Sequence, residues 1–161
     1  MHTHLKLPNS KNCFACGLEN PFGLMLEFYA DGEGGVVGKY SIPGQFEGYP
    51  GIAHGGIVTT ILDEILSRVF LVEDHNRLMY TAKMTTRFRR HVPVEQELHL
   101  SGQAIRDRDR TAEAAAQIRD KDGEVLAEAE ALLVSLSPEE LDPARLDALG
   151  WRVYPDEEIH K

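Results

Sequence analysis

The sequence has 161 residues, which is enough for one hydrophobic core and too few for two ordinary domains. The 26 acidic residues outnumber the 17 basic ones, and a formal charge of -9 disfavours a nucleic-acid-binding surface. No apolar run approaches the roughly 18 residues of a membrane helix, and the first residues contain no apolar signal-peptide core. We therefore expect one soluble, cytoplasmic domain with neither a nucleic-acid nor a membrane partner.

Both cysteines lie near the N-terminus, as the Cys-x-x-Cys unit Cys13 and Cys16. A zinc site usually has four ligands, but there is no second cysteine pair, and the spacing of His2 and His4 resembles no standard finger. A redox pair normally begins a helix after a strand, whereas residues 20–23 predict a turn. Zinc binding and redox chemistry stay open as alternatives to the simplest interpretation, two thiols in an ordered loop.

We divide the chain into a lead-in (1–23), a main domain (24–136) and a tail (137–161). The main domain begins with two β-forming segments, at 24–29 and 36–42, which predict a hairpin. A loop with two prolines and three glycines then follows the hairpin.

The strongest helix signal comes directly after the sequence His54-Gly55-Gly56. Isoleucine or valine recurs every fourth residue from Ile57 to Val69, and further apolar residues stand beside them. This pattern predicts a helix that is apolar around most of its circumference and is therefore buried. Asp63 and Glu64 interrupt the apolar surface, where a carboxylate needs partners or a shifted pKa.

Four β-like segments follow the helix: residues 80–90, a segment around Leu98 and Leu100, residues 111–119, and a return strand at 125–133 after an Asp-Gly turn. Alanines recur on one face of the last two segments, which lets a helix pack closely on them. The element order lacks the alternation of strands and helices typical of a parallel sheet. We expect an α+β fold in which a curved antiparallel sheet wraps around one long central helix.

The tail contains two competing helix starts. Ser137-Pro138-Glu139-Glu140 supplies an N-cap, a proline at the first position and a glutamate at the third, whereas Asp142-Pro143 can restart a turn. In either case Gly150 ends the helix, and the segment that begins at Trp151 is predicted to lie on the surface with one aromatic anchor.

The two glycines before the helix offer a chemical possibility. The first amides of a helix lack internal partners and lie at the positive end of its dipole, so those of Gly55 and Gly56 can bind a carbonyl oxygen. Glycines are also common at helix starts. Asp63 lies roughly 10 Å further along the helix, too far to reach the same small group unless a second chain packs its helix alongside in the opposite direction. A lone helical carboxylate can instead cap a neighbouring group.

Four motifs together resemble a known family. They are Cys13-Phe14-Ala15-Cys16-Gly17, Asn20-Pro21-Phe22-Gly23-Leu24, Gly48-Tyr49-Pro50-Gly51-Ile52-Ala53-His54-Gly55-Gly56, and Leu62-Asp63-Glu64. From Cys13 to Val134 the chain resembles the hot-dog-fold acyl-CoA thioesterases, especially the phenylacetate-pathway-like branch. The resemblance implies a hot-dog fold.

The resemblance also implies roles for individual residues. Gly55 matches the glycine whose amide binds the thioester carbonyl, and Asp63 matches the base or nucleophile contributed by the partner subunit. His54 matches the histidine that shapes the turn, and Thr81 the Ser or Thr that positions water. Glu47 stands where relatives often carry an Asn or Gln that orients the substrate, and a carboxylate donates no hydrogen bond unless it is protonated.

Basic residues are concentrated in one stretch. Between residues 75 and 94 there are five cations and no acid, in a chain of net charge -9. Arg87 and Arg89 share a face of the predicted strand, and Arg90 points the other way. These arginines can bind the phosphates of coenzyme A, or they can protect an edge strand by charge.

The sequence thus predicts hydrolysis of an acyl-CoA thioester, with no cofactor or metal, in a homodimer or a dimer of dimers. An alternative is a non-catalytic acyl-CoA-binding or regulatory hot-dog protein, which Glu47 favours. A hydratase on the same scaffold is a second alternative, but it needs a histidine that reaches the substrate, and His54 belongs to a turn.

Overall fold

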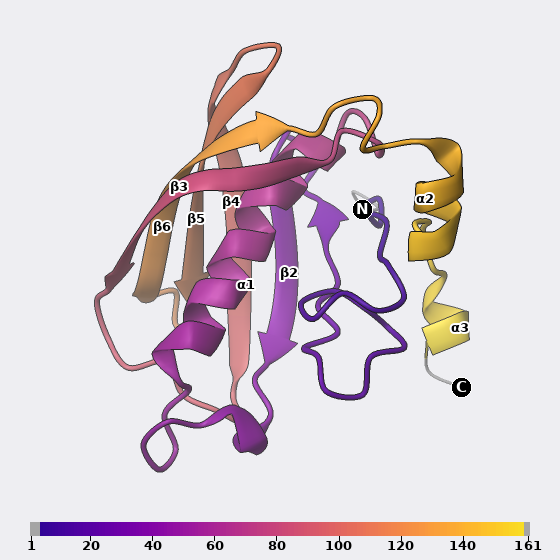
Figure 1. Cartoon of the computed structure of the whole chain (residues 1–161). Coiled ribbons are helices and arrows are strands. Elements are labelled where there is room, and N and C mark those ends of the chain that lie inside the picture. The colour runs from indigo at the N-terminus through magenta and orange to yellow at the C-terminus, as the bar shows by residue number, and fades with distance from the viewer. Residues whose placement is uncertain (1–3, 160–161) are drawn as a thin grey trace.

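The computed structural model describes residues 4–159, which form one sheet packed on one long helix (Figure 1). Adjacent strands of the sheet are antiparallel, in the order β1-β2-β4-β5-β6-β3. The strands are β1 (Tyr29–Ala30), β2 (Val36–Ser41), β3 (Met79–Phe88), β4 (Glu97–Asp107), β5 (Thr111–Arg119) and β6 (Val125–Ser135). Helix α1 (Gly55–Arg68) continues into a 3-10 turn, Val69–Leu71.

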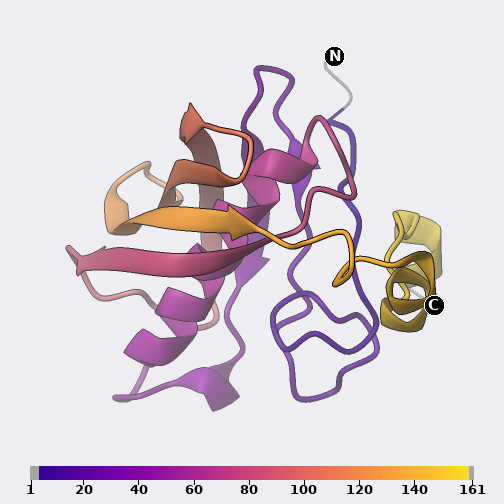
Figure 2. The same ribbon diagram turned by 45° about the horizontal axis from the view of Figure 1, so that its top comes forward.

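The sheet curls around α1, as Figure 2 shows from a second direction. The arrangement confirms the expected α+β architecture with one central helix. None of the helices within residues 4–159 has both the length and the apolar content needed to cross a bilayer.

Small residues in the sheet allow α1 to pack closely against it. The buried alanines of β5 and β6 are Ala112, Ala114, Ala116, Ala127, Ala129 and Ala131. Gly102 in β4 lies at the closest approach, because a Cβ added there would be 2.6 Å from Cγ2 of Ile65 and 3.1 Å from methyl carbons of Val36 and Val69. The core therefore has no room for a side chain at this position.

The predicted first strand at 24–29 is wrong in extent, since β1 has only two residues. Leu24, Leu26 and Phe28 are fully buried, as the alternation of apolar residues suggests. Their backbone pairs with the lead-in instead of a neighbouring strand: the amides of Leu24 and Leu26 donate to carbonyls of residues 14 and 15. Met25 adopts a positive φ of 53°, which interrupts a regular strand.

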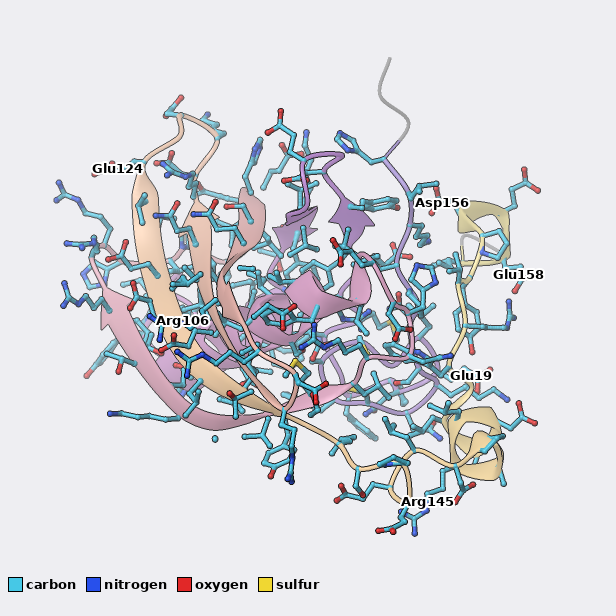
Figure 3. All side chains as sticks on the ribbon, turned by 90° about the horizontal axis from the view of Figure 1, so that it is seen from above. Glu19, Arg106, Glu124, Arg145, Asp156 and Glu158 are labelled. Carbon is cyan, nitrogen blue, oxygen red and sulfur yellow. The ribbon has the colours of Figure 1, made fainter. Side chains whose placement is uncertain are left out.

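The tail forms its helix at the second of the two predicted starts. The first motif makes only a reciprocal cap, in which Ser137 and Glu140 exchange hydrogen bonds. Helix α2 (Pro143–Leu149) begins after the Asp142 cap and ends at Gly150, whose φ is 64°. A short helix, α3 (Asp156–Ile159), follows. Figure 3 shows the labelled acidic side chains of α3 at the periphery of the molecule.

A buried arginine joins the lead-in and the tail to α1. The Arg68 side chain forms an ion pair with Glu64 at 2.8 Å and donates a hydrogen bond to the carbonyl of Pro8. Its guanidinium also lies over the rings of Phe28 and Trp151, at 5.5 and 5.3 Å from their centroids. Trp151 is thus the aromatic anchor expected in the tail, and the lead-in passes between the sheet and α2 (Figure 2).

Replacing Gly102 by alanine tests the close contact between α1 and the sheet. We expect Gly102→Ala to lower the free energy of unfolding by about 1–3 kcal/mol, because the added methyl group forces Ile65 and the helix outward. Urea denaturation measures the change. Ser101→Ala, a neighbouring change on the opposite face of β4, serves as the control and should change stability by less than about 0.5 kcal/mol. Equal stability of the two variants would contradict the packing argument.

Candidate functional site

The N-terminus of α1 is capped by the side chain of His54. Its Nδ1 atom accepts a hydrogen bond from the Gly56 amide at 2.9 Å, so in the neutral ring the proton is on Nε2. The amides of Ile57 and Val58 donate to the His54 carbonyl. The amide of Gly55 has no acceptor among residues 4–159. One N–H group at the positive end of the helix dipole is thus available to a ligand.

The two glycines at the start of α1 differ in whether the backbone amide is free to bind a ligand. Gly56 was predicted to bind substrate, but its amide is already bonded to His54, so the structure gives it no free donor. Gly55 is exposed and keeps its donor. His54 lies in the turn as the resemblance implies, with its ring committed to the cap.

The carboxylate of Asp63 faces strand β3. The Thr81 hydroxyl donates a hydrogen bond to Oδ1 of Asp63 at 2.6 Å, and both residues are partly buried. Thr81 is paired with the buried Leu133 of β6, on the side of the sheet that faces α1. A backbone irregularity follows directly, between Thr81 and Lys83. The hydrogen bond fixes one carboxylate oxygen and leaves Oδ2 without a donor among the described residues.

Gly55 and Asp63 belong to the same continuous helix, eight residues apart. At 1.5 Å of rise per residue the separation is about 12 Å along the axis. A carbonyl group bound at the Gly55 amide is therefore out of reach of Asp63 in the same chain.

Strand β3 runs beside the helix and connects the two ends of the site. Thr81 contacts Asp63 near one end, and near the other a Cβ added to Gly55 would lie 3.7 Å from the ring of Phe88. In the sheet order β3 has a neighbour only on one side, β6. Both Gly55 and Asp63 therefore lie along the open edge of the sheet.

Glu47 stabilises the loop that leads into α1. Its Oε2 atom accepts a hydrogen bond from the Gly51 amide at 3.0 Å, and Gly51 has a positive φ of 78°. Glu47 is itself exposed. The structure thus gives its carboxylate a local role in the loop, next to the helix N-terminus.

Of the three predicted phosphate-binding arginines, Arg87 and Arg89 both lie beside Glu128, whereas Arg90 is paired elsewhere. Arg87 is opposite Glu128 on the face of the sheet turned away from α1, where it lines a hollow of about 900 Å³. Arg89 forms an ion pair with Glu128 at 2.5 Å, and Arg90 one with Glu124 at 2.8 Å. The hydrogen bond from Arg89 holds the pKa of Glu128 below its usual value. The local excess of positive charge is therefore partly neutralised by Glu128 of β6 and by Glu124, which directly precedes β6.

The structure does not bring Arg87 together with Gly55 and Asp63. Arg87 and Arg89 come directly before and after Phe88, whose ring is close to Gly55, but both lie beside Glu128. Arg90 is paired with Glu124. The acidic partners of Arg89 and Arg90 are more than thirty residues away in the sequence, which is why counting charges along the chain missed them.

Among residues 4–159, no three His, Cys, Asp or Glu side chains are grouped as a metal site. His2, one of the histidines considered for zinc, lies outside the described residues.

Comparison with known families identifies the scaffold. A family model described as the thioesterase superfamily matches residues 50–127, a range that contains the Gly55 amide, Asp63 and Thr81. Over this range the chain is similar to the thioesterase superfamily. No curated protein is similar enough to match the chain.

Solved structures of the superfamily share its hot-dog fold. A protein described as a thioesterase superfamily protein is 28% identical, with a TM-score of 0.68, over 76% of this chain and 59% of its own. The chain therefore spans about three fifths of that relative. The E. coli PaaI protein from the phenylacetic acid degradation operon is 15% identical, with a TM-score of 0.62, over 71% of this chain and 81% of its own.

A third structure is a hypothetical thioesterase from Streptococcus pneumoniae with coenzyme A. It is 20% identical, with a TM-score of 0.58, over 65% of this chain and 80% of its own. At these low identities PaaI and the streptococcal protein show a shared fold only, and the phenylacetate branch stays a prediction for this chain.

Proposed function

We propose that this protein hydrolyses an acyl-CoA thioester to a free acid and coenzyme A. The observation that carries the proposal is the Asp63 carboxylate, held by Thr81 at 2.6 Å on the same open edge as the unpaired amide of Gly55. A polarised carbonyl and a positioned carboxylate are what thioester hydrolysis requires. The streptococcal relative with coenzyme A supports the class of substrate.

The proposed site takes one group from each of two chains. Two α1 helices packed side by side in opposite directions would place the Gly55 amide of one chain near Asp63 of the other. The open edge of β3 gives a second chain a place to pair. A homodimer, or a dimer of dimers, would then contain two equivalent sites per pair.

In the reaction, the Gly55 amide donates a hydrogen bond to the thioester oxygen and the helix dipole stabilises the negative charge that develops there. Asp63 either takes a proton from water, which then attacks the carbonyl carbon, or attacks that carbon itself. In the first route the tetrahedral intermediate expels the thiolate of coenzyme A, which takes the proton back from Asp63. In the second, attack by Asp63 expels the thiolate of coenzyme A, which takes a proton from solvent, and water then hydrolyses the acyl-enzyme anhydride to the free acid and the Asp63 carboxylate. Thr81 keeps Oδ1 fixed and so directs Oδ2 to the chemistry.

The alternative is an acyl-CoA-binding protein without turnover. Glu47 favours it, because its carboxylate accepts from Gly51 and supplies no donor to a substrate. In our proposal the hydrogen-bond donor is the Gly55 amide, so hydrolysis proceeds without a donor at position 47.

Asparagine at position 63 tests the mechanism. We expect Asp63→Asn to fold normally, since the Thr81 hydroxyl can donate to the amide oxygen, and to lose about 10²–10⁴-fold in kcat. Thiol release from short, long and aromatic acyl-CoAs measures turnover. Unchanged turnover in the folded variant would contradict the role of Asp63, and tight binding by the native protein without any turnover would select the binding protein instead.

Proline at position 55 removes the proposed donor while leaving the helix intact. Proline is favoured at the first helical position, and the ψ of 136° at His54 is the conformation that a residue before proline prefers. We expect Gly55→Pro to lose about 10²–10³-fold in kcat. The matched control, Gly55→Ala, keeps the amide and places its methyl group in ordinary contact with Phe88, so its loss should be much smaller. Equal losses in both variants would point to a steric role for the glycine.

Mixed dimers of the two variants test whether each site takes one group from each chain. Asp63→Asn and Gly55→Pro subunits are each inactive alone, but a mixed dimer has one site with both groups intact. After unfolding and refolding of an equal mixture, random pairing should restore about a quarter of the native activity. No recovery in a mixture shown to contain mixed dimers would contradict a site built from two chains.

A further inference from the structure

The lead-in holds its two cysteines in a tight turn. The Gly17 amide donates to the Cys13 carbonyl at 2.8 Å and closes the turn. Within it, the Cys16 amide donates to the Cys13 sulfur at 3.5 Å, and the Cys13 amide donates to the Ser10 hydroxyl at 3.3 Å. The bond from the Cys16 amide to the Cys13 sulfur places the two residues next to each other in this turn.

The two thiols differ in access and in ionisation. Cys13 is exposed, whereas Cys16 is only 3% exposed. A hydrogen bond from the Cys16 thiol, with weaker ones from backbone amides, lowers the pKa of Cys13 to about 6. The same hydrogen bond, together with burial, raises the pKa of Cys16. Glu64 of α1 opposes ionisation of both sulfurs, and Arg68 favours it for Cys16.

We propose that Cys13 and Cys16 are a redox-active dithiol that reacts with small disulfides, such as glutathione disulfide, with Cys13 as the attacking and Cys16 as the resolving residue. This assignment is independent of the thioesterase reaction. It rests on the exposure of residue Cys13, the buried Cys16 next to it and the hydrogen bond from the Cys16 amide to the Cys13 sulfur. A metal ion is a poorer fit, because the described residues provide no third ligand beside the pair.

The reaction proceeds in two exchanges. The Cys13 thiolate attacks one sulfur of the small disulfide, the sulfur–sulfur bond breaks, and one small thiolate leaves and is protonated by solvent. Cys16 then gives its proton to solvent, and its sulfur attacks Cys13 in the mixed disulfide and expels the second small thiolate. The dithiol is oxidised by two electrons, and one small disulfide is reduced to two thiols.

Full-length reduced protein and three variants test the assignment. Each protein is treated with glutathione disulfide, the reaction is quenched with acid, and the mass of the intact protein is measured by mass spectrometry. We expect the native chain to lose two hydrogens with no lasting adduct. Cys16→Ser, and Cys16→Ala as a second variant, should each stop with one glutathionyl group attached. Cys13→Ser should react at least about tenfold more slowly, because Cys16 is buried. A lasting adduct on the native chain, or a Cys13→Ser variant as reactive as the native chain, would overturn the proposal.

The pH dependence of alkylation provides a second readout. At pH 7 a thiol with a pKa of about 6 is about 90% thiolate, against about 1% at its ordinary value near 9. Lower nucleophilicity of the more acidic thiol offsets about 20-fold of this gain, so the net acceleration is only a few-fold. The midpoint is therefore more informative than the rate. We expect the rate of Cys13 labelling by iodoacetamide to rise with pH, with a midpoint near pH 6 in the native chain and at a higher pH in Cys16→Ala. The same midpoint near pH 9 in both proteins would contradict the assigned pair.

Discussion

The burial of one helix is the constraint on which the rest of the structure depends. Helix α1 buries its apolar side against the sheet, whereas its other side carries half-exposed polar residues. The sheet must therefore curl around the apolar side, and the strands beneath it must carry alanine and, at Gly102, no side chain. The first turn of the helix lies at the end of the core, where Gly55 and Gly56 are exposed. The site at Gly55 is a consequence of how the core is filled.

Both acidic side chains of helix α1 have a partner. Asp63 accepts from Thr81, and Glu64 is paired with Arg68, which in turn contacts the lead-in at Pro8 and the tail at Trp151. Charges without such partners would cost several kcal/mol in this environment. The bond to Thr81 thus orients a candidate catalytic carboxylate, and the contacts of Arg68 hold the lead-in and the tail against the helix.

Much of this arrangement is predictable from the sequence because it follows periodic patterns. The four-residue repeat of α1, the alternation in β5 and β6 and the glycines after His54 all predict local structure that the molecule adopts. Groups that meet across the fold were harder to predict. The acids that neutralise Arg89 and Arg90 come from β6 and from the turn before it, and the His54 ring accepts the hydrogen bond of the Gly56 amide. The segment around Met25 pairs with the lead-in. These contacts depend on how the chain packs and not on local patterns.

The donor at Gly55 is a main-chain group, and this affects how the protein can change during evolution. A backbone amide survives every substitution except proline, whereas a carboxylate is lost by almost any change at position 63. Under the proposed mechanism, substitutions at position 63 therefore abolish hydrolysis far more readily than substitutions at position 55. A lineage that drifted towards binding alone would keep the His-Gly-Gly turn and the fold, and the residue at position 63 would distinguish it from hydrolytic relatives.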